Sequence, residues 1–171
     1  DTDVLIWGFG SIGQNMAPIF TALGARVRGI ASTAGERAGY PCFTEDDLPR
    51  LLPETDVLVM VLPSTPATRN VLNAERLALL KPTSLVVNVG RGTCIDEDAL
   101  VAALTAGTIG GAALDVFATE PLPTGSPLWD APNTILTPHV AGGRPLGVEA
   151  AVRANIAHLQ AGEPLDLLAK P

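Results

Sequence analysis

Three glycines follow the first apolar segment of the chain at a spacing that strongly restricts the local fold. Val4–Trp7 is typical of a buried strand, Gly8, Gly10 and Gly13 come directly after it, and a helical pattern starts within them. In such a motif the first glycine permits a tight turn, the second lets backbone approach a phosphate, and the third lets helix pack closely on strand. Because the amino end of a helix attracts anions, this order favours a site for a dinucleotide pyrophosphate.

Taken alone, the glycine spacing is equally typical of a plain strand-to-helix turn. The rest of the chain favours the cofactor site, because strands and helices alternate throughout. The expected strands are Val4–Trp7, Arg26–Ala31, Asp56–Leu62, Leu85–Val89, Gly110–Val116 and Ile135–Thr137. The expected helices are Ile12–Leu23, Glu45–Leu52, Asn73–Leu80, Asp96–Ala106 and Gly147–Gly162, with loops at Ser32–Gly39 and Glu120–Pro132. This alternation predicts an α/β fold, a Rossmann-type doubly wound parallel sheet in strand order 3-2-1-4-5-6 with helices on both faces.

Length and composition narrow the class of protein. The 171 residues suit one domain, residues 1–171, and a net charge of −7 argues against a nucleic-acid partner. Apolar stretches such as Val57–Leu62 are too short to cross a bilayer, so no membrane partner is expected. Cys42 and Cys94 have no metal-ligand spacing, which predicts no metal site and two reduced thiols in a cytoplasmic protein. Since the chain begins at Asp1, we expect it to be a piece of a longer protein.

The end of the second expected strand bears on the choice between NAD and NADP. NAD sites of this kind usually carry an acidic residue there for the ribose hydroxyls, whereas this chain has Ala31, Ser32 and Thr33. Without a carboxylate to repel it, a 2′-phosphate would find hydrogen-bond donors in the two hydroxyls and a positive charge in Arg37 or, less favoured, Arg28. Alternatively these are ordinary loop residues and NAD is held by weaker contacts. We expect NAD or NADP, with a slight preference for NADP.

Three ionisable residues follow successive expected strands, where such sheets place their ligands. They are Arg91 after Leu85–Val89, Glu120 after Gly110–Val116 and His139 after Ile135–Thr137. A guanidinium holds a carboxylate or polarises a carbonyl through its planar donors. An imidazole exchanges a proton with the substrate oxygen, and a carboxylate behind it fixes the tautomer. Taken singly, each is better explained without a function: Arg91 as a surface or ion-pair residue, Glu120 as a loop residue and His139 as a partly buried histidine. Together they indicate reduction of a 2-keto acid by hydride.

The chain resembles the nucleotide-binding domain of the D-isomer-specific 2-hydroxyacid dehydrogenases over nearly its whole length. The segments that carry the resemblance are Gly8–Gly13, Asn88–Gly92 with Ile95–Glu97, Leu114–Phe117 with Glu120–Leu122, and Thr137–His139. The resemblance implies that Arg91, Glu120 and His139 form the catalytic set and that Asp115 contacts the nicotinamide carboxamide. It also implies that Pro63 to Thr68 lies along the cofactor.

The full set of expected cofactor-binding residues combines the glycine motif with the resemblance. It comprises Gly8, Gly10, Ser11, Ile12, Gly13, Ala31, Ser32, Thr33, Leu62, Pro63, Thr68, Val89, Gly90, Asp115, His139 and Gly142. Ala31 departs from the aspartate that is usual in NAD-dependent members. The family's second, substrate-binding lobe is absent from this sequence, so we expect the isolated chain to be inactive.

The resemblance implies a small 2-hydroxy or 2-keto acid as substrate and a homodimer paired through this domain. We expect the dimer contact at the loop Glu120–Pro132 with Trp129. A non-catalytic dinucleotide-binding or dimerisation module is the alternative that the missing lobe leaves open.

Overall fold

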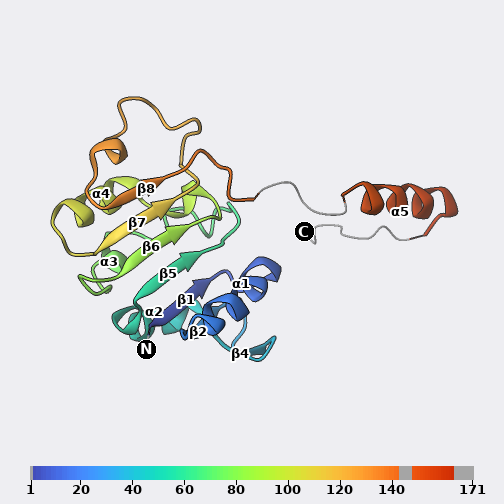
Figure 1. Ribbon diagram of the computed structural model, residues 1–171, viewed down its shortest axis with the longest axis horizontal. Coiled ribbons are helices and arrows are strands. Elements are labelled where there is room, and N and C mark those ends of the chain that lie inside the picture. The colour runs from blue at the N-terminus through green and yellow to red at the C-terminus, as the bar shows by residue number, and fades with distance from the viewer. Residues whose placement is uncertain (1, 143–147, 164–171) are drawn as a thin grey trace. The chain divides into compact units, whose positions relative to one another are not determined.

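A computed structural model describes residues 2–142 and 148–163 of the chain (Figure 1). The chain divides into two compact units, Asp1–Ala141 and Gly142–Pro171. The first unit carries the sheet and all three residues of the expected catalytic set. The second contains one helix, α5 (Val148–Ala161), whose expected first residue, Gly147, lies outside the described residues.

The first unit is built on one sheet in the order β3-β4-β2-β1-β5-β6-β7-β8, in which only the β3–β4 pair is antiparallel (Figure 1). The strands are β1 (Asp3–Trp7), β2 (Arg26–Ile30), β3 (Gly35–Arg37), β4 (Tyr40–Phe43), β5 (Val57–Met60), β6 (Leu85–Asn88), β7 (Gly111–Leu114) and β8 (Thr134–Leu136). The α-helices are α1 (Ser11–Ala22), α2 (Leu48–Leu51), α3 (Ala74–Leu77) and α4 (Glu97–Thr105), and the 3-10 helices are η1 (Glu45–Asp47), η2 (Leu52–Glu54), η3 (Gly92–Cys94) and η4 (Pro127–Asp130). The predicted Rossmann-type α/β sheet is thereby confirmed.

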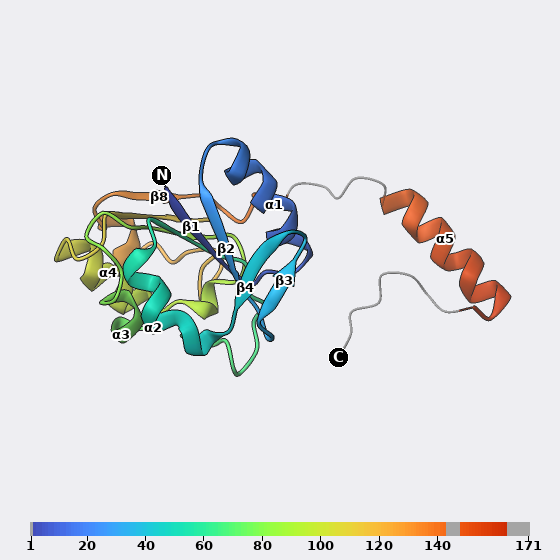
Figure 2. The same ribbon diagram turned by 90° about the horizontal axis from the view of Figure 1, so that it is seen from below.

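Successive side chains of each strand point to opposite faces, which gives the sheet two separate cores. Leu5 and Trp7 of β1 pack in the larger core, on the face that α2, α3 and α4 cover (Figure 2). Val4 and Ile6 pack in the smaller core on the face of α1. Helices therefore lie on both faces, as the parallel topology requires.

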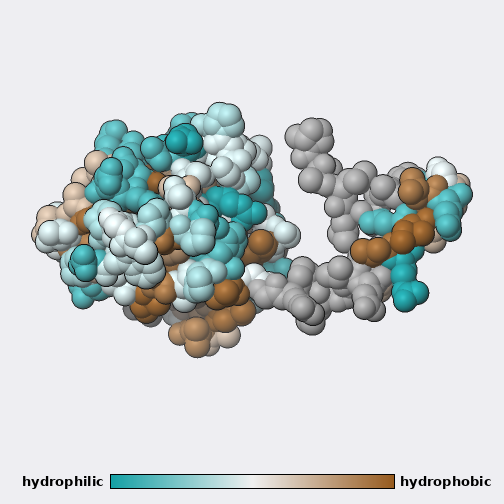
Figure 3. Space-filling view, turned by 90° about the horizontal axis from the view of Figure 1, so that it is seen from above, coloured by the Kyte–Doolittle hydropathy of each residue, from teal (hydrophilic) through white to brown (hydrophobic). Residues whose placement is uncertain are grey.

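The α1 face is not equally covered along the sheet. Within residues 2–141, Leu85 of β6 and Ile135 of β8 point to this face by strand alternation and are 46% and 67% exposed. Seen from above, the surface of the first unit is mostly hydrophilic, with hydrophobic residues gathered along one border (Figure 3).

One expected strand has a different place in the order. The segment expected third, Asp56–Leu62, contains β5, which pairs directly with β1 rather than with β2. The third position belongs to β4, inside a region where we expect no strand, and β3 lies within the expected loop Ser32–Gly39. The order 3-2-1-4-5-6 holds only when β4 is counted as the third strand. Strand β3, at the edge of the sheet, is short and polar, and Pro41 interrupts the short strand β4, so neither carries a run of aliphatic residues.

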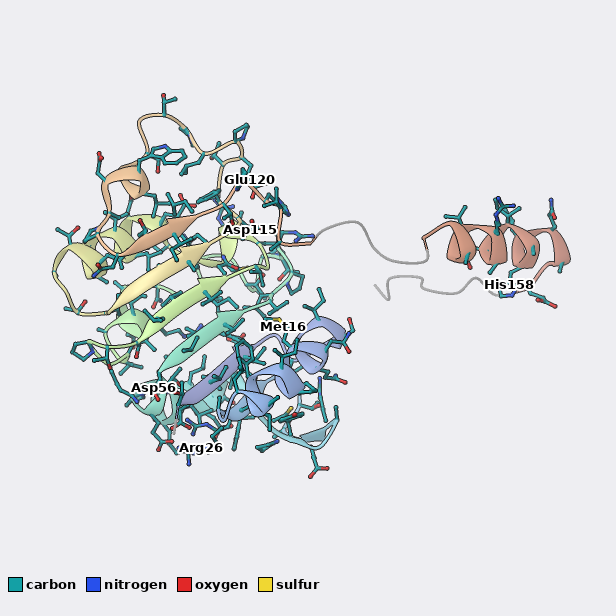
Figure 4. All side chains as sticks on the ribbon, in the orientation of Figure 1. Met16, Arg26, Asp56, Asp115, Glu120 and His158 are labelled. Atoms are coloured by element: carbon teal, nitrogen blue, oxygen red, sulfur yellow. The ribbon has the colours of Figure 1, made fainter. Side chains whose placement is uncertain are left out.

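The amino end of the sheet is held by ion pairs. Asp3 accepts hydrogen bonds from Arg26, and the buried Arg28 contacts Glu54 at 2.6 Å. Asp56 pairs with Lys81 at 2.6 Å. Asp56 and Arg26 lie at the sheet edge opposite to that of Asp115 and Glu120 (Figure 4). The candidate site therefore lies at the carboxyl ends of the strands, where the reactive residues were expected.

Helix α5 is described by itself. Val152, Ile156 and Leu159 are each more than half exposed and lie on one side of the helix by their spacing. Among residues 2–142 and 148–163, none of the helices is long and apolar enough to cross a membrane.

Candidate active site

The glycine turn has the geometry that its sequence predicts. Gly8 has a left-handed φ of 102°, and a Cβ there would lie 2.5 Å from the Val61 carbonyl oxygen. A Cβ on Gly13 would lie 2.9 Å from the Gly8 oxygen, so its absence allows α1 to sit tightly on the turn. Around Gly10, by contrast, no atom lies within 4 Å of a Cβ position.

Space in front of the turn forms a cleft of about 600 Å³ between the carboxyl ends of β1, β2 and β5. Residues expected to bind cofactor that line it are Gly8, Gly10, Ala31, Ser32, Leu62, Pro63 and Thr68. No described side chain caps the amino end of α1, so the first-turn amides of Ser11, Ile12 and Gly13 are available to an anion. The open side of Gly10 and these amides fit a dinucleotide pyrophosphate.

The end of β2 presents hydroxyls and one guanidinium. Ser32 and Arg37 line the cleft, and the Arg37 Nη2 donates to the Thr33 Oγ1 at 2.8 Å. Arg28 was the less favoured candidate for contact with a 2′-phosphate. That prediction is wrong, because Arg28 is buried at the amino end of the sheet against Glu54 and Asp3. Glu45 and Asp46 also line the cleft, and Glu45 is paired with Arg76 at 3.4 Å.

Arg91 leaves β6 on a turn that a buried side chain holds. The Asn88 Nδ2 donates to the Arg91 carbonyl at 3.1 Å, and the Asn88 Oδ1 accepts from the Gly90 N–H at 3.0 Å. Gly90 packs so closely on the next strand end that a Cβ would lie 2.7 Å from the Leu62 nitrogen. The Arg91 guanidinium is exposed and donates to the Gly90 carbonyl at 2.6 Å.

Glu120 and His139 form a hydrogen-bonded pair. The Glu120 Oε2 lies 2.7 Å from the His139 Nδ1, and the other oxygen of Glu120 accepts from the Phe117 N–H at 3.0 Å. The carboxylate is therefore fixed at both oxygens, and the imidazole keeps its Nε2 for another partner. The hydrogen bond from His139, followed by that from Phe117, holds the pKa of Glu120 below its ordinary value, and the Arg91 charge adds to this effect.

His139 has a left-handed backbone with φ of 54°, a conformation that costs a residue other than glycine about 1–3 kcal/mol. Asp115 lies directly after β7 and accepts hydrogen bonds from residues on either side of His139. Its carboxylate accepts from the Thr137 hydroxyl at 2.6 Å, the Val140 N–H at 2.9 Å and the Ala141 N–H at 2.8 Å. Burial would raise the pKa of Asp115, but these bonds and the His139 charge outweigh it and lower the pKa.

The expected site residues thus fall into two groups along one edge of the sheet. One group lines the cleft or its helix end, and the other comprises Arg91, Asp115, Glu120 and His139 on the turns after β6, β7 and β8. Val89 is half-buried at the end of β6, and Gly142 is exposed at the start of the second unit. Asn88 and Thr137 were not among the residues expected from sequence. A buried polar residue inside the apolar run Leu85–Val89 was the available signal for Asn88.

A family model agrees with this geometry. The model described as "D-isomer specific 2-hydroxyacid dehydrogenase, NAD binding domain" matches residues 1–141, the same span as the first unit. The chain belongs to this family.

Relatives of the 2-hydroxyacid dehydrogenase domain include solved structures with bound cofactor. One, from Xanthobacter autotrophicus Py2 in complex with NADPH and MES, has a TM-score of 0.91 and 39% identity, over 99% of this chain and 71% of that one. An NADPH-dependent glyoxylate/hydroxypyruvate reductase from Sinorhizobium meliloti, in complex with NADP and sulfate, has a TM-score of 0.89 and 36% identity, over 99% of this chain and 55% of that one.

A curated relative is the D-3-phosphoglycerate dehydrogenase of Synechocystis sp., 45% identical over 134 residues, or 78% of this chain and 24% of that protein. The chain spans 24% to 55% of the length of this and other curated relatives that it matches. The chain therefore corresponds to one domain of the 2-hydroxyacid dehydrogenases and not to the remaining length of those proteins.

Proposed function

We propose that residues 1–171 form the cofactor-binding and catalytic domain of an oxidoreductase that transfers hydride between a nicotinamide cofactor and C2 of a small 2-hydroxy or 2-keto acid. The observation that carries the proposal is the 2.7 Å pair of Glu120 and His139 at the carboxyl edge of the sheet. A cleft that fits a dinucleotide opens at the same edge. Relatives named glyoxylate/hydroxypyruvate reductase and D-3-phosphoglycerate dehydrogenase support this class of substrate.

Each reactive side chain has a defined task in this proposal. A bound nicotinamide supplies the hydride. Because Glu120 holds Nδ1 of His139, the Nε2 gives a proton to the carbonyl oxygen of the keto acid and takes it back in the oxidative direction. Glu120 stabilises the protonated imidazole and fixes its orientation. The exposed guanidinium of Arg91 binds the substrate carboxylate through its planar donors.

Steady-state kinetics of the full-length protein tests the proposal, with glyoxylate, hydroxypyruvate and pyruvate as substrates and NADPH or NADH as reductant. We expect His139→Ala to lower kcat by about 100-fold or more, the scale of a positioned acid–base group. His158→Ala changes the other histidine of the chain and serves as the matched control, with kcat expected within about twofold. Arg91→Ala should raise KM for the keto acid. Undiminished kcat in His139→Ala would remove that residue from the reaction, and cofactor binding without turnover of any acid would support the non-catalytic module instead.

We propose NADP as the preferred cofactor. Ala31 brings no carboxylate to the end of β2, while Ser32 and Arg37 line the cleft there. The relatives from Xanthobacter and Sinorhizobium carry NADPH and NADP in their structures. Arg37 is the one candidate cation that remains at this end of β2 among the described residues, since Arg28 is paired elsewhere.

Arg37→Ala tests this preference directly. A charge-assisted hydrogen bond to phosphate is worth about 1.5–3 kcal/mol, so KM for NADPH should rise about tenfold or more while KM for NADH changes by less than about twofold. Arg50→Ala, at an exposed arginine that bonds Asp47, is the matched control. Equal changes for both cofactors would show that Arg37 does not read the 2′-phosphate.

We also propose a homodimer that pairs through this domain, with the loop 120–132 at the contact. Trp129 in this loop is 53% exposed, and its indole N–H donates to the Pro123 carbonyl at 2.9 Å, which holds the ring in place at the surface.

Cys42 and Cys94 are buried free thiols, which supports a reducing compartment such as the cytoplasm.

A further inference from the structure

Most hydrogen bonds between the turn that presents His139 and the neighbouring strand end are made to one residue. Asp115 accepts four hydrogen bonds from this turn, three at its carboxylate and one, from the His139 N–H at 2.8 Å, at its backbone carbonyl. The donors come from positions 137, 139, 140 and 141, so the bonds bracket His139 on both sides. This arrangement fixes the path of the backbone through a left-handed residue.

Asp115 is a rigid base for such a turn. It is 5% exposed, and its own N–H donates to the Asn88 carbonyl at 3.0 Å, which extends the pairing of β7 with β6. The His139 side chain, in contrast, is 47% exposed, and its Nδ1 is hydrogen-bonded to Glu120. Packing therefore contributes little to the orientation of the imidazole, which depends on its bond to Glu120 and on the course of its backbone.

We propose that Asp115 and Thr137 are positioning residues, which clamp the turn 137–141 so that the imidazole of His139 meets Glu120 with its Nε2 turned toward the substrate. Thr137 is the less obvious of the two, because it is an exposed residue. Its hydroxyl nevertheless donates the shortest bond of the clamp, at 2.6 Å. The kinetic part of this inference rests on the proposed function, whereas its structural part does not.

A carboxylate is the side chain that this turn requires. Two backbone N–H groups and one hydroxyl all donate to the same group, and an amide offers only one acceptor oxygen in place of two. In Asp115→Asn the new NH₂ group would face a backbone N–H and leave it unpaired. The same bonds lower the pKa of Asp115, so the acceptor stays ionised at neutral pH.

This clamp is separable from a contact between Asp115 and the cofactor, which the family resemblance implies. A carboxylate has about four acceptor positions, and the turn uses three of them. Any substitution at Asp115 therefore alters both roles, but Thr137→Val removes one bond of the clamp and leaves the Asp115 carboxylate in place. Thr137 does not line the cleft between β1, β2 and β5.

The experiment compares Thr137→Val, which removes the hydroxyl, with Thr137→Ser, which retains it, in the full-length protein. Thr134→Val is the matched control, because that hydroxyl donates to the Ala131 carbonyl and not to Asp115. We expect Thr137→Val to lower kcat about tenfold, with KM for keto acid and for NADPH within about twofold, since a misplaced acid–base group slows the reaction more than it weakens binding. Thr137→Ser and Thr134→Val should stay within about twofold of the parent in kcat.

Two structural readouts accompany the kinetics. Hydrogen exchange at the Val140 and Ala141 amides should accelerate in Thr137→Val and in Asp115→Asn, and the nitrogen-15 shifts of the His139 imidazole should show a loss of the single tautomer. The exposed position of Thr137 keeps this test valid if Asp115→Asn fails to fold.

Unchanged kcat and unchanged amide exchange in Thr137→Val would overturn the clamp, and so would a rise in the KM for NADPH alone. If the parent protein reduces no keto acid, the proposed function fails by itself. The exchange and imidazole measurements then decide the clamp without reference to activity.

Discussion

At the scale of single residues, the glycines around the cofactor cleft serve two different purposes. Gly8, Gly13 and Gly90 are required by the fold, because a Cβ at each would approach another main-chain oxygen or nitrogen to within 3.0 Å. Gly10 has no such requirement, since the space around its missing Cβ is open and its φ of −86° suits any residue. Its lack of a side chain is therefore not explained by the fold and is consistent with the proposed close approach of a phosphate.

Gly10→Ala is expected to separate binding from stability. The free energy of unfolding should change by no more than about 1 kcal/mol, the scale of a helix-cap substitution. The Kd for NADPH should rise about tenfold or more, because the methyl group occupies space in front of the uncapped amides of α1. Urea unfolding and titration calorimetry measure the two quantities. Gly125→Ala, at a glycine with equally open surroundings in the loop 120–132, should leave both unchanged, and equal NADPH affinity in the two variants would argue against the pyrophosphate site.

At the scale of elements, sequence predicts best where a buried run of apolar residues continues without interruption. The central strands β1, β5 and β6 were predicted to within a few residues, because each is a nearly continuous apolar run in the middle of the sheet. Strands β3 and β4 were missed, because these short strands at one side of the sheet owe their place to pairing with a neighbour rather than to a run of aliphatic residues. The helix expected over Asn73–Leu80 is limited to Ala74–Leu77, with Asn73 as its cap.

The same reasoning separates the site residues that could be predicted from those that could not. Arg91, Glu120 and His139 could be proposed from sequence because each follows a strand at the edge where ligands bind. The bond made by Thr137 depends on how two turns meet across neighbouring strands, and local sequence carries no direct trace of that meeting. The bonds of Asn88 are local, and their one signal in the sequence is a polar residue inside an apolar run. Arg28 was considered beside a phosphate because sequence distance does not tell which end of a strand a long side chain reaches.

At the scale of the whole molecule, carboxylates with lowered pKa values occupy both edges of the sheet. At the amino edge, the hydrogen bond from Arg26 lowers the pKa of Asp3, and the Asp3 N–H followed by Lys81 lowers that of Asp56. At the carboxyl edge the pKa values of Asp115 and Glu120 are lowered as well. The folded protein therefore binds fewer protons than the unfolded chain in acid.

Stability should fall as the pH decreases below the ordinary carboxyl pKa values of about 4. A folded-state pKa that is lower than the unfolded one adds stability above the unfolded value, and this contribution is lost as the pH falls through the folded value. Urea unfolding at pH 7 and pH 3 measures the change. Asp56→Asn should reduce the pH dependence, because it removes one of the paired carboxylates. A free energy of unfolding that is equal at both pH values would contradict the assigned ion pairs.

The proposed nucleotide site and the proposed acid–base residues occupy different halves of the sheet, the first at the ends of β1, β2 and β5 and the second on the turns after β6 to β8. The two halves are joined by the backbone pairing of β5 with β6. Substitutions at positions 31 to 37 should therefore be able to change the coenzyme preference, for example toward a less expensive reductant, without altering the proposed acid–base residues. Conversely, a mutant library intended to change the acid substrate should target the turns after β6 and need not alter coenzyme binding.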